Sequence, residues 1–215
     1  MSERLCSLNE VVVTKRTRKR SYRLSARAES QAETHRRIVD AAVALHEKLG
    51  PAHTPLSAIA EEAGVTRLTL YRHFPDEAAM FAACTSHWGA QHPLPEAARW
   101  DGIKDPAARA AAALAVHYDY YARTRRMWFV AYRDVSLVKP IQPVLAQVDA
   151  HLTALAETLS AAFRAKGAAH RNITVTLRHA LGYATWTDLE ARGLDTKGKV
   201  ALVAQWLEGA RKSRA

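Results

Sequence analysis

Apolar residues recur at three- and four-residue steps along most of the chain, which is the period of amphipathic α-helices. The first such pattern begins near Gln31, and two short ones follow over residues 55–63 and 66–74, separated by Gly64. No segment alternates apolar and polar residues as a half-buried strand does. The pattern therefore predicts an all-α fold of about nine helices, four of them before residue 91.

The stretch from residue 91 to residue 106 contains three prolines and a glycine, a concentration of helix breakers that indicates a connection between two domains. We therefore place one domain at residues 31–90 and a second at residues 91–215. The helices expected in the second domain cover residues 107–122, 125–138, 141–162, 172–191 and 196–212.

Residues 1–30 lack a sustained apolar period and contain eight Lys and Arg residues against three Glu. This composition predicts a basic, disordered tail. Two interpretations of the basic run Lys15–Arg20 stay open. The run is either a solvated tail without a role, which could even be translated sequence upstream of the natural start, or an arm that follows DNA. The formal charge of the chain is +10, but residues 31–90 carry five basic and seven acidic residues. Net charge alone therefore does not locate a nucleic-acid site.

The two short helices joined through Gly64 have the lengths and turn of a helix-turn-helix, whose second helix enters the DNA major groove. Thr54 is expected to cap the first of them, with Pro55 at its first position, and Thr66 to cap the second. Five apolar residues would hold the pair together: Ile59, Ala60, Val65, Leu70 and Phe74. The second helix is therefore the predicted recognition helix.

The remaining side chains of this segment have the chemistry of DNA contacts. Arginines can reach guanine edges or phosphates, a threonine can contact a base or a thymine methyl, and tyrosine and histidine can donate to phosphate oxygens. The predicted DNA-binding residues are Thr54, Thr66, Arg67, Leu68, Thr69, Tyr71, Arg72 and His73. An ordinary three-helix core with solvated charges is the alternative that this spacing makes improbable.

The runs Thr54–Thr66 and Thr69–Asp76 resemble the N-terminal domain of the TetR family of transcriptional regulators, because Ile-Ala, Ala-Gly-Val and Leu-Tyr-Arg-His-Phe fall at the family's spacing. The resemblance covers about residues 31–85. It implies a three-helix DNA-binding domain, a fourth connecting helix, and a C-terminal domain that dimerises and binds a small effector. If the family's roles hold at the matching positions, the residues that contact phosphates would be Thr54, Thr66, Tyr71 and His73. Those nearest to the bases would be Arg67, Thr69 and Arg72.

Two positions depart from that family's usual pattern. Leu68 stands where a small residue or proline is common, and Glu77 stands where a phosphate-contacting lysine is common. A carboxylate at the second position would repel DNA. The operator sequence is therefore expected to differ from that of any relative.

The resemblance places several aromatic and histidine side chains of the second domain around an effector pocket. Aromatic side chains with a polar tip suit a largely apolar or aromatic ligand, and they suit an ordinary core equally well. The candidates are His117, Tyr118, Tyr121, Trp128, Phe129, Tyr132, Tyr183 and Trp186.

The expected protein is cytoplasmic and binds a double-stranded palindromic operator, from which the effector releases it. We expect a homodimer, because one short recognition helix reads few bases whereas two read a palindrome. The sequence contains no Gly-rich phosphate loop, nucleophile elbow or metal-ligand spacing, so no catalytic residue, cofactor or metal is expected. It also has no run of the roughly 20 apolar residues that a membrane helix requires. Repression and activation both stay open, because the sign of regulation depends on where the operator lies. A helical ligand-binding protein or enzyme without a DNA role is the alternative function.

Overall fold

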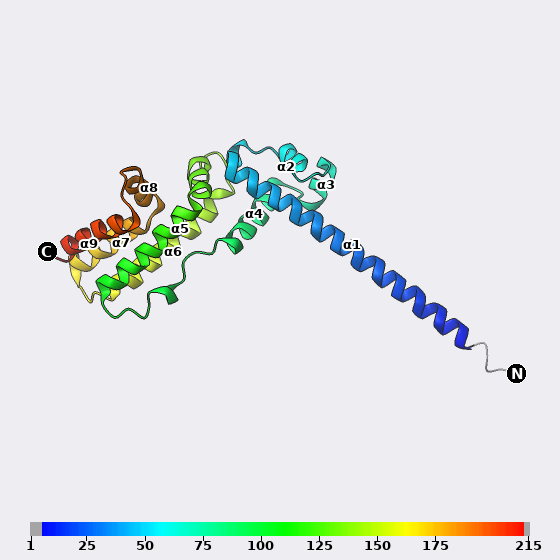
Figure 1. The fold of residues 1–215 in the computed structure, drawn as a ribbon, viewed down its shortest axis with the longest axis horizontal. Helices are drawn as coiled ribbons and strands as arrows, with labels where there is room; N and C mark the ends of the chain where they lie inside the picture. The colour runs from blue at the N-terminus through cyan, green and yellow to red at the C-terminus, as the bar shows by residue number, and fades with distance from the viewer. Residues whose placement is uncertain (1–5, 213–215) are drawn as a thin grey trace. The chain divides into compact units, whose positions relative to one another are not determined.

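The computed structural model of the chain describes the backbone of residues 6–212 and the side chains of residues 26–212. Within this range every regular element is a helix, and Figure 1 shows α1 to α9 in chain order. The prediction of an all-α fold is confirmed. The chain divides into two compact units, an N-terminal unit of Met1–Ala44 and Pro55–Cys84 and a C-terminal unit of Leu45–Thr54 and Thr85–Ala215.

The N-terminal unit contains most of α1 (Cys6–Leu49), all of α2 (Leu56–Glu62) and α3 (Arg67–His73), and the first half of α4 (Glu77–Gln91). Its core consists of apolar side chains that are at most 7% exposed: Ile38, Val39, Ala41, Ala42, Ile59, Ala60, Ala63, Leu70, Phe74, Met80 and Cys84. Four of the five apolar residues expected to hold the two short helices together are in this set, and Val65 is half-buried. The apolar periodicity of residues 55–74 therefore identified the residues that α2 and α3 contribute to the core.

Helix α1 begins at Cys6, far ahead of the start near Gln31 that the apolar period predicts. Residues 26–33 of this helix are exposed. A helix satisfies its backbone hydrogen bonds internally, so it forms without an apolar face to mark it in the sequence. The side chains of the basic run Lys15–Arg20, which we considered as an arm along DNA, lie outside the described residues.

Gly64 ends α2 in a conformation that favours glycine, with a φ of +63°. The Val65 N–H donates to the Ala60 carbonyl at 2.9 Å, and the Gly64 N–H donates to the Glu61 carbonyl at 3.0 Å. This pair of bonds is a Schellman motif, which satisfies the last carbonyls of a helix and turns the chain sharply. The turn between α2 and α3 therefore depends on a left-handed residue at position 64.

Replacing Gly64 with Ala is expected to lower the free energy of unfolding by about 1–2 kcal/mol, because a Cβ disfavours the left-handed conformation. Urea denaturation measures this loss. No atom would lie within 4 Å of the new Cβ, so the effect is conformational and not a clash. Gly64→Asn is the matched control, since Asn tolerates a positive φ, and it should retain more stability than Gly64→Ala. Equal stability of all three proteins would show that a side chain at position 64 carries no conformational cost.

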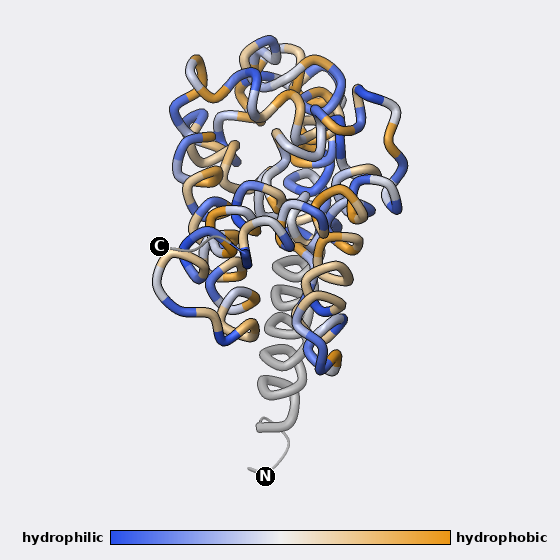
Figure 2. The backbone as a smooth tube through the Cα atoms, turned by 90° about the vertical axis from the view of Figure 1, so that its left-hand side faces the viewer, coloured by the Kyte–Doolittle hydropathy of each residue, from blue (hydrophilic) through white to orange (hydrophobic). Residues whose placement is uncertain are grey.

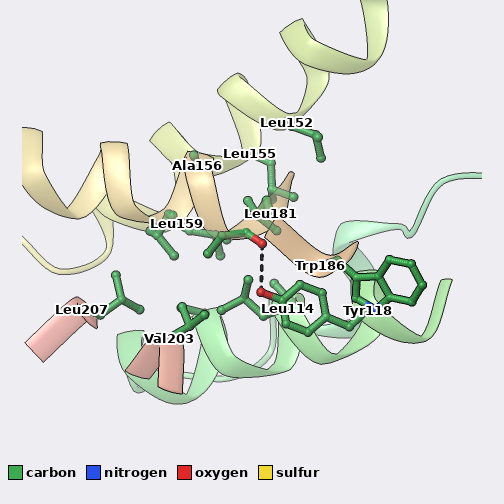
Figure 3. Close-up of a cluster of buried hydrophobic side chains, with 14 of the residues drawn as sticks. Leu114, Tyr118, Leu152, Leu155, Ala156, Leu159, Leu181, Trp186, Val203 and Leu207 are labelled. Atoms are coloured by element: carbon green, nitrogen blue, oxygen red, sulfur yellow. Dashed lines mark hydrogen bonds between the residues drawn. The ribbon is translucent and has the colours of Figure 1, made fainter. Parts of the chain in front are cut away.

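The C-terminal unit contains α5 (Pro106–Asp134), α6 (Ile141–Ala161), α7 (Gly167–Leu181), α8 (Tyr183–Ala191) and α9 (Thr196–Lys212), with 3₁₀ turns at Pro51–His53 and Ala97–Arg99. Helix α7 packs against α6 and α9, and α5 packs against α9. Figure 2 shows hydrophobic and hydrophilic positions alternating around the helices, as amphipathic packing requires. Figure 3 shows leucines of α5, α6, α7 and α9 in one buried cluster, which also contains Tyr118.

Two helix boundaries in this unit differ from those expected. Helix α5 is continuous where we expected two helices, because no glycine or proline interrupts it after its first residue, Pro106. The helix expected over residues 172–191 is instead divided into α7 and α8 at Gly182, whose ψ of 142° is extended. The Tyr118 hydroxyl donates to the Ala180 carbonyl at 2.9 Å (Figure 3). The Tyr121 hydroxyl donates to the Leu181 carbonyl, also at 2.9 Å, and the two bonds hold the end of α7.

The last turn of α1 is bound to α5 by a set of hydrogen bonds that we call the α1-terminal cluster, made by Arg126, Arg133 and Asp134. Arg126 donates to the carbonyl of Glu47 at 2.8 Å and also to that of Lys48. Arg133 donates to the Leu49 carbonyl at 2.7 Å and to both carboxylate oxygens of Asp134, at 2.6 and 3.0 Å. Two guanidinium groups therefore occupy the negative end of the α1 dipole.

Asp134 completes the α1-terminal cluster by binding the chain just beyond α1. Its side chain is 1% exposed, and its Oδ2 accepts from the Ala52 N–H at 3.0 Å. The hydrogen bonds from Arg133 hold the pKa of Asp134 below its usual range, so the carboxylate stays ionised. A buried charge of this kind is stable only when it is paired and hydrogen-bonded, as it is here.

His117 is fully buried on α5, with Nδ1 2.8 Å from the Ala113 carbonyl, and burial lowers its pKa to about 4. Its pKa in the unfolded chain is about 6.5, so below that pH the unfolded state binds the proton preferentially. Stability is therefore unaffected above pH 6.5 and is expected to fall by about 2 kcal/mol from this residue by pH 5. Urea denaturation of the protein and of His117→Leu at pH 7 and pH 5 measures the effect. An identical pH dependence of both proteins would contradict it.

Candidate nucleic-acid interface

Helix α3 is short, capped at its start and largely solvent-exposed. The Thr66 Oγ1 accepts from the Thr69 N–H at 3.1 Å and lies 2.9 Å from the Thr69 Oγ1. The prediction that Thr66 caps this helix is confirmed. Leu70 and Phe74 are buried beneath the helix, and the ring of Phe74 packs 4.7 Å from that of His35 on α1. One face of α3 is therefore fixed to the core.

The other face of α3 presents side chains that the core does not use. Leu68 is 80% exposed and Tyr71 is 44% exposed, and Arg67 and Arg72 are exposed as well. The guanidinium groups of these two arginines have no hydrogen bond or ion pair to other side chains among the described residues. An exposed helix face with free guanidinium groups, a phenol and a large apolar side chain can contact phosphates, base edges and thymine methyls.

Thr69 and His73 are half-buried on the same helix. Burial, His35 and Arg72 lower the pKa of His73, so its imidazole is neutral at pH 7. A neutral imidazole can donate one N–H to a phosphate but adds no positive charge. Asp76 caps the next helix by accepting from the Ala79 N–H at 2.7 Å, and Glu77 is exposed in the first turn of α4. The carboxylate at position 77 is therefore exposed, and its repulsion of DNA stays a prediction from the sequence.

Thr54 does not have the capping role expected of it. The N-cap of α2 is Pro55, with no side-chain hydrogen bond, and the Thr54 hydroxyl donates to the Gly50 carbonyl at 2.8 Å. The hydroxyl proton that a phosphate contact would require is thus committed within the turn after α1. A carbonyl four residues earlier competes successfully with the helix terminus for a threonine hydroxyl.

The eight effector candidates lie in two environments. Six are buried in the C-terminal unit and two are substantially exposed, Phe129 at 48% and Tyr132 at 42%. The buried six are His117, Tyr118, Tyr121, Trp128, Tyr183 and Trp186. Trp128, Tyr183 and Trp186 surround Tyr121 with ring centroids 5.4–6.0 Å away, and Tyr132 stacks on Tyr183.

The polar tips of the buried tyrosines are already hydrogen-bonded. The Tyr183 hydroxyl donates to the Arg125 carbonyl at 3.0 Å, as those of Tyr118 and Tyr121 do to α7. By contrast, the Trp186 indole N–H and the His117 Nε2 are buried without a hydrogen-bond partner in the described part of the chain. A surface cavity of about 300 Å³ beside α5 is lined by none of the eight candidates. Sequence reasoning missed this cavity, for which the breaker-rich segment near Pro93 and Pro95 was the available signal.

The described residues contain no group of three or more His, Cys, Asp or Glu side chains that could hold a metal ion. They also include no helix with the length and apolar character needed to cross a bilayer.

Comparison with known proteins gives the same family for the N-terminal segment and the same fold for most of the chain. Residues 38–84 match the family model described as bacterial regulatory proteins, tetR family. A TetR-like transcriptional regulator from Rhodococcus sp. RHA1 is similar in structure, with a TM-score of 0.60 and 19% identity over 84% of this chain and 97% of that one. No curated protein matches the sequence.

Two further solved structures are similar to a comparable degree. The fatty acid degradation regulator FadR from Bacillus halodurans has a TM-score of 0.56 and 20% identity, covering 84% of this chain and 97% of its own. NalD, the secondary repressor of the MexAB-OprM multidrug efflux pump in Pseudomonas aeruginosa, has a TM-score of 0.55 and 19% identity, covering 84% and 96%. At these identities the likeness describes the fold.

Proposed function

The chain carries the DNA-binding domain of the tetR family of bacterial regulatory proteins at residues 38–84, and from this premise we propose that it is a transcriptional repressor that a small-molecule effector releases from a palindromic operator. The observation that carries the proposal is α3 itself. It is capped by Thr66 and anchored by Leu70, and its outer face exposes Arg67 and Arg72. A helix held in this way can enter the major groove without rearrangement.

The proposed DNA contacts follow the chemistry of that face. Arg67, Arg72 and Thr69 read base edges, and Leu68 contacts thymine methyl groups. Thr66, Tyr71 and His73 contact phosphates and set the register of the helix. We leave Thr54 out of this set because its hydroxyl donates to Gly50. Specificity therefore depends chiefly on two arginines and on an exposed leucine.

A second copy of the chain is the proposed partner. A palindromic operator presents two half-sites about one DNA turn, roughly 34 Å, apart, and two recognition helices read it. In the C-terminal unit, Val175 on α7 is 62% exposed, and one turn later His179 lies 6.4 Å from the half-buried Trp206 ring of α9. Dimer interfaces are enriched in aromatic side chains and depleted in charged ones, and α7 and α9 bring an exposed valine and a half-buried tryptophan to the surface. We propose that this face of α7 and α9 joins the two subunits.

Release by an effector would be a population shift. A ligand that binds more tightly to a conformer with unsuitable spacing of the two recognition helices draws the equilibrium away from DNA. Proteins of similar structure include a fatty acid degradation regulator and the secondary repressor of a multidrug efflux pump.

Selection of binding sites from random DNA, followed by gel-shift titration of the selected sequence, tests the proposed function. The expected outcome is a near-palindromic site bound by two subunits, with the mass of the complex measured by light scattering. Affinity should fall steeply as salt rises, since phosphate contacts release counterions. Failure to enrich any sequence at low salt would refute the proposal and favour a ligand-binding protein without a DNA role.

A further inference from the structure

The cavity of about 300 Å³ in the C-terminal unit lies where the end of α4 meets α5. Its lining combines residues of the segment after α4, among them Leu94 and Pro95, with Tyr120 and Arg123 of α5. The Tyr120 hydroxyl donates to the His92 carbonyl at 3.2 Å and so joins these two walls. The cavity is at the lower end of the sizes that small-molecule sites have.

The cavity is lined by more positive than negative side chains. Arg99 and Arg123 line it against a single acidic residue, Glu96. The Arg99 side chain has no hydrogen bond or ion pair within the described residues. Arg123 uses only its Nε–H, which donates to the Asp119 carbonyl at 3.2 Å, so its terminal amino groups are available. Burial raises the pKa of Tyr120 to about 12, which keeps this wall of the cavity neutral.

Two available guanidinium groups beside apolar side chains select a particular class of ligand. Guanidinium binds carboxylates through paired, charge-assisted hydrogen bonds. Leu94, Pro95 and the ring of Tyr120 offer an apolar surface to the rest of the molecule. We propose that this cavity binds a small organic acid, with the carboxylate held by Arg99 and Arg123 and an apolar body against Leu94, Pro95 and Tyr120.

The position of the cavity suits an effector site, an assignment that rests on the proposed function. Helix α4 contributes its first residues, from Glu77 to Cys84, to the N-terminal unit and its remainder to the C-terminal unit. The cavity is lined by Gln91, the last residue of α4. A ligand there contacts α5 and the end of a helix that both units share, so its binding can favour one position of α4 over another.

Calorimetric titration of the full-length protein without DNA tests the binding. The probes are phenylacetate and octanoate, with phenylacetamide and octanamide as neutral counterparts of the same shape. We expect both acids to bind and their amides to bind at least tenfold more weakly, because a charged hydrogen bond is lost. Inorganic phosphate at the same concentration should not displace the acids. Absence of binding by both acids, or equal binding of the amides or of phosphate, would overturn the proposal.

Arg123→Gln is expected to weaken binding of the acids about tenfold or more. Arg125→Gln is the matched control, because it removes the same charge from the same helix at an exposed position outside the cavity. It should change the affinity by less than twofold. Equal losses in the two variants would indicate a general effect of net charge and would overturn the site. Unchanged binding by Arg123→Gln would do the same.

A second titration separates the site from the proposed function. The acid that binds most tightly is added to the complex with selected DNA, and its effect on DNA affinity is compared between the unsubstituted protein and Arg123→Gln. Release of DNA from the unsubstituted protein alone supports the effector assignment. Binding of the acid without any change in DNA affinity would overturn that assignment. Binding of the acid by a protein that selects no DNA would refute the proposed function and leave the acid site intact.

Discussion

Replacing Arg67 and Tyr71 together with alanine is expected to weaken binding to the selected operator by about 30- to 1,000-fold. The two side chains are exposed on α3 and belong to the proposed contacts with bases and phosphates. Loss of one base contact and one phosphate contact costs about 2–4 kcal/mol in total, and each 1.4 kcal/mol is a factor of ten. Gel-shift titration at fixed salt measures the change, and the slope of log affinity against log salt should also become shallower.

Two controls distinguish a lost contact from a lost fold. Because neither side chain belongs to the core, the double variant should unfold at the same temperature as the unsubstituted protein. Leu70→Ala removes a side chain that is 1% exposed under the same helix and should lower both stability and DNA affinity. Arg192→Ala removes an exposed arginine that pairs with the exposed Asp188 and should leave DNA binding unchanged. Full affinity in the double variant would show that α3 is not the recognition helix.

The helix-turn-helix segment was predictable because its structure depends on neighbours in sequence, whereas the start of α1 at Cys6 was not predicted. A threonine cap, a glycine in the left-handed conformation and an apolar period of three and four each act within one or two helical turns. Thr66, Gly64 and Leu70 accordingly have the roles that the sequence assigns to them. Thr54, which precedes α2, does not have its predicted role. Its hydroxyl donates to the Gly50 carbonyl and does not cap α2, and the sequence does not show which of these two roles a threonine takes.

The C-terminal unit was less predictable because its determining contacts join distant residues. Tyr118 and Tyr121 fix the break between α7 and α8 from about 60 positions away, and no local signal reveals that their hydroxyls are engaged. The aromatic residues suggested a ligand pocket. Six of the eight candidates are buried side chains, and their role in binding an effector stays a prediction. The acid-binding cavity was missed for the opposite reason: only Tyr120 among its lining residues is aromatic.

Replacing Gly50 with Ala is expected to destabilise the protein more than any other glycine substitution considered. Gly50 has a φ of +94°, and a Cβ there would lie 1.9 Å from an amino group of Arg133 and 2.4 Å from the Asp134 Oδ2. The left-handed conformation alone costs about 1–2 kcal/mol. Displacing Asp134 also leaves the Ala52 N–H without its acceptor, which costs about 1–3 kcal/mol. A loss near 3 kcal/mol corresponds to a fall of about 6–12 °C in melting temperature, measured by calorimetry.

The control for this substitution is a second glycine-to-alanine replacement whose expected effect has the opposite sign. Gly89 lies inside α4 with no neighbouring atom within 4 Å of the position that an alanine Cβ would take, so Gly89→Ala should raise stability by about 0.5–1 kcal/mol.

Asp134→Asn separates the two contributions of Asp134 to the α1-terminal cluster. The amide oxygen can still accept from the Ala52 N–H but cannot form an ion pair with Arg133. If the charge pair matters, Asp134→Asn will melt below the unsubstituted protein. Its stability will also vary less with pH below about 4, the ordinary pKa of an aspartate, because there the unfolded state binds a proton at Asp134 that the folded state, with its lowered pKa, does not. Equal melting temperatures for Gly50→Ala, Gly89→Ala and the unsubstituted protein would show that the α1-terminal cluster does not hold the end of α1.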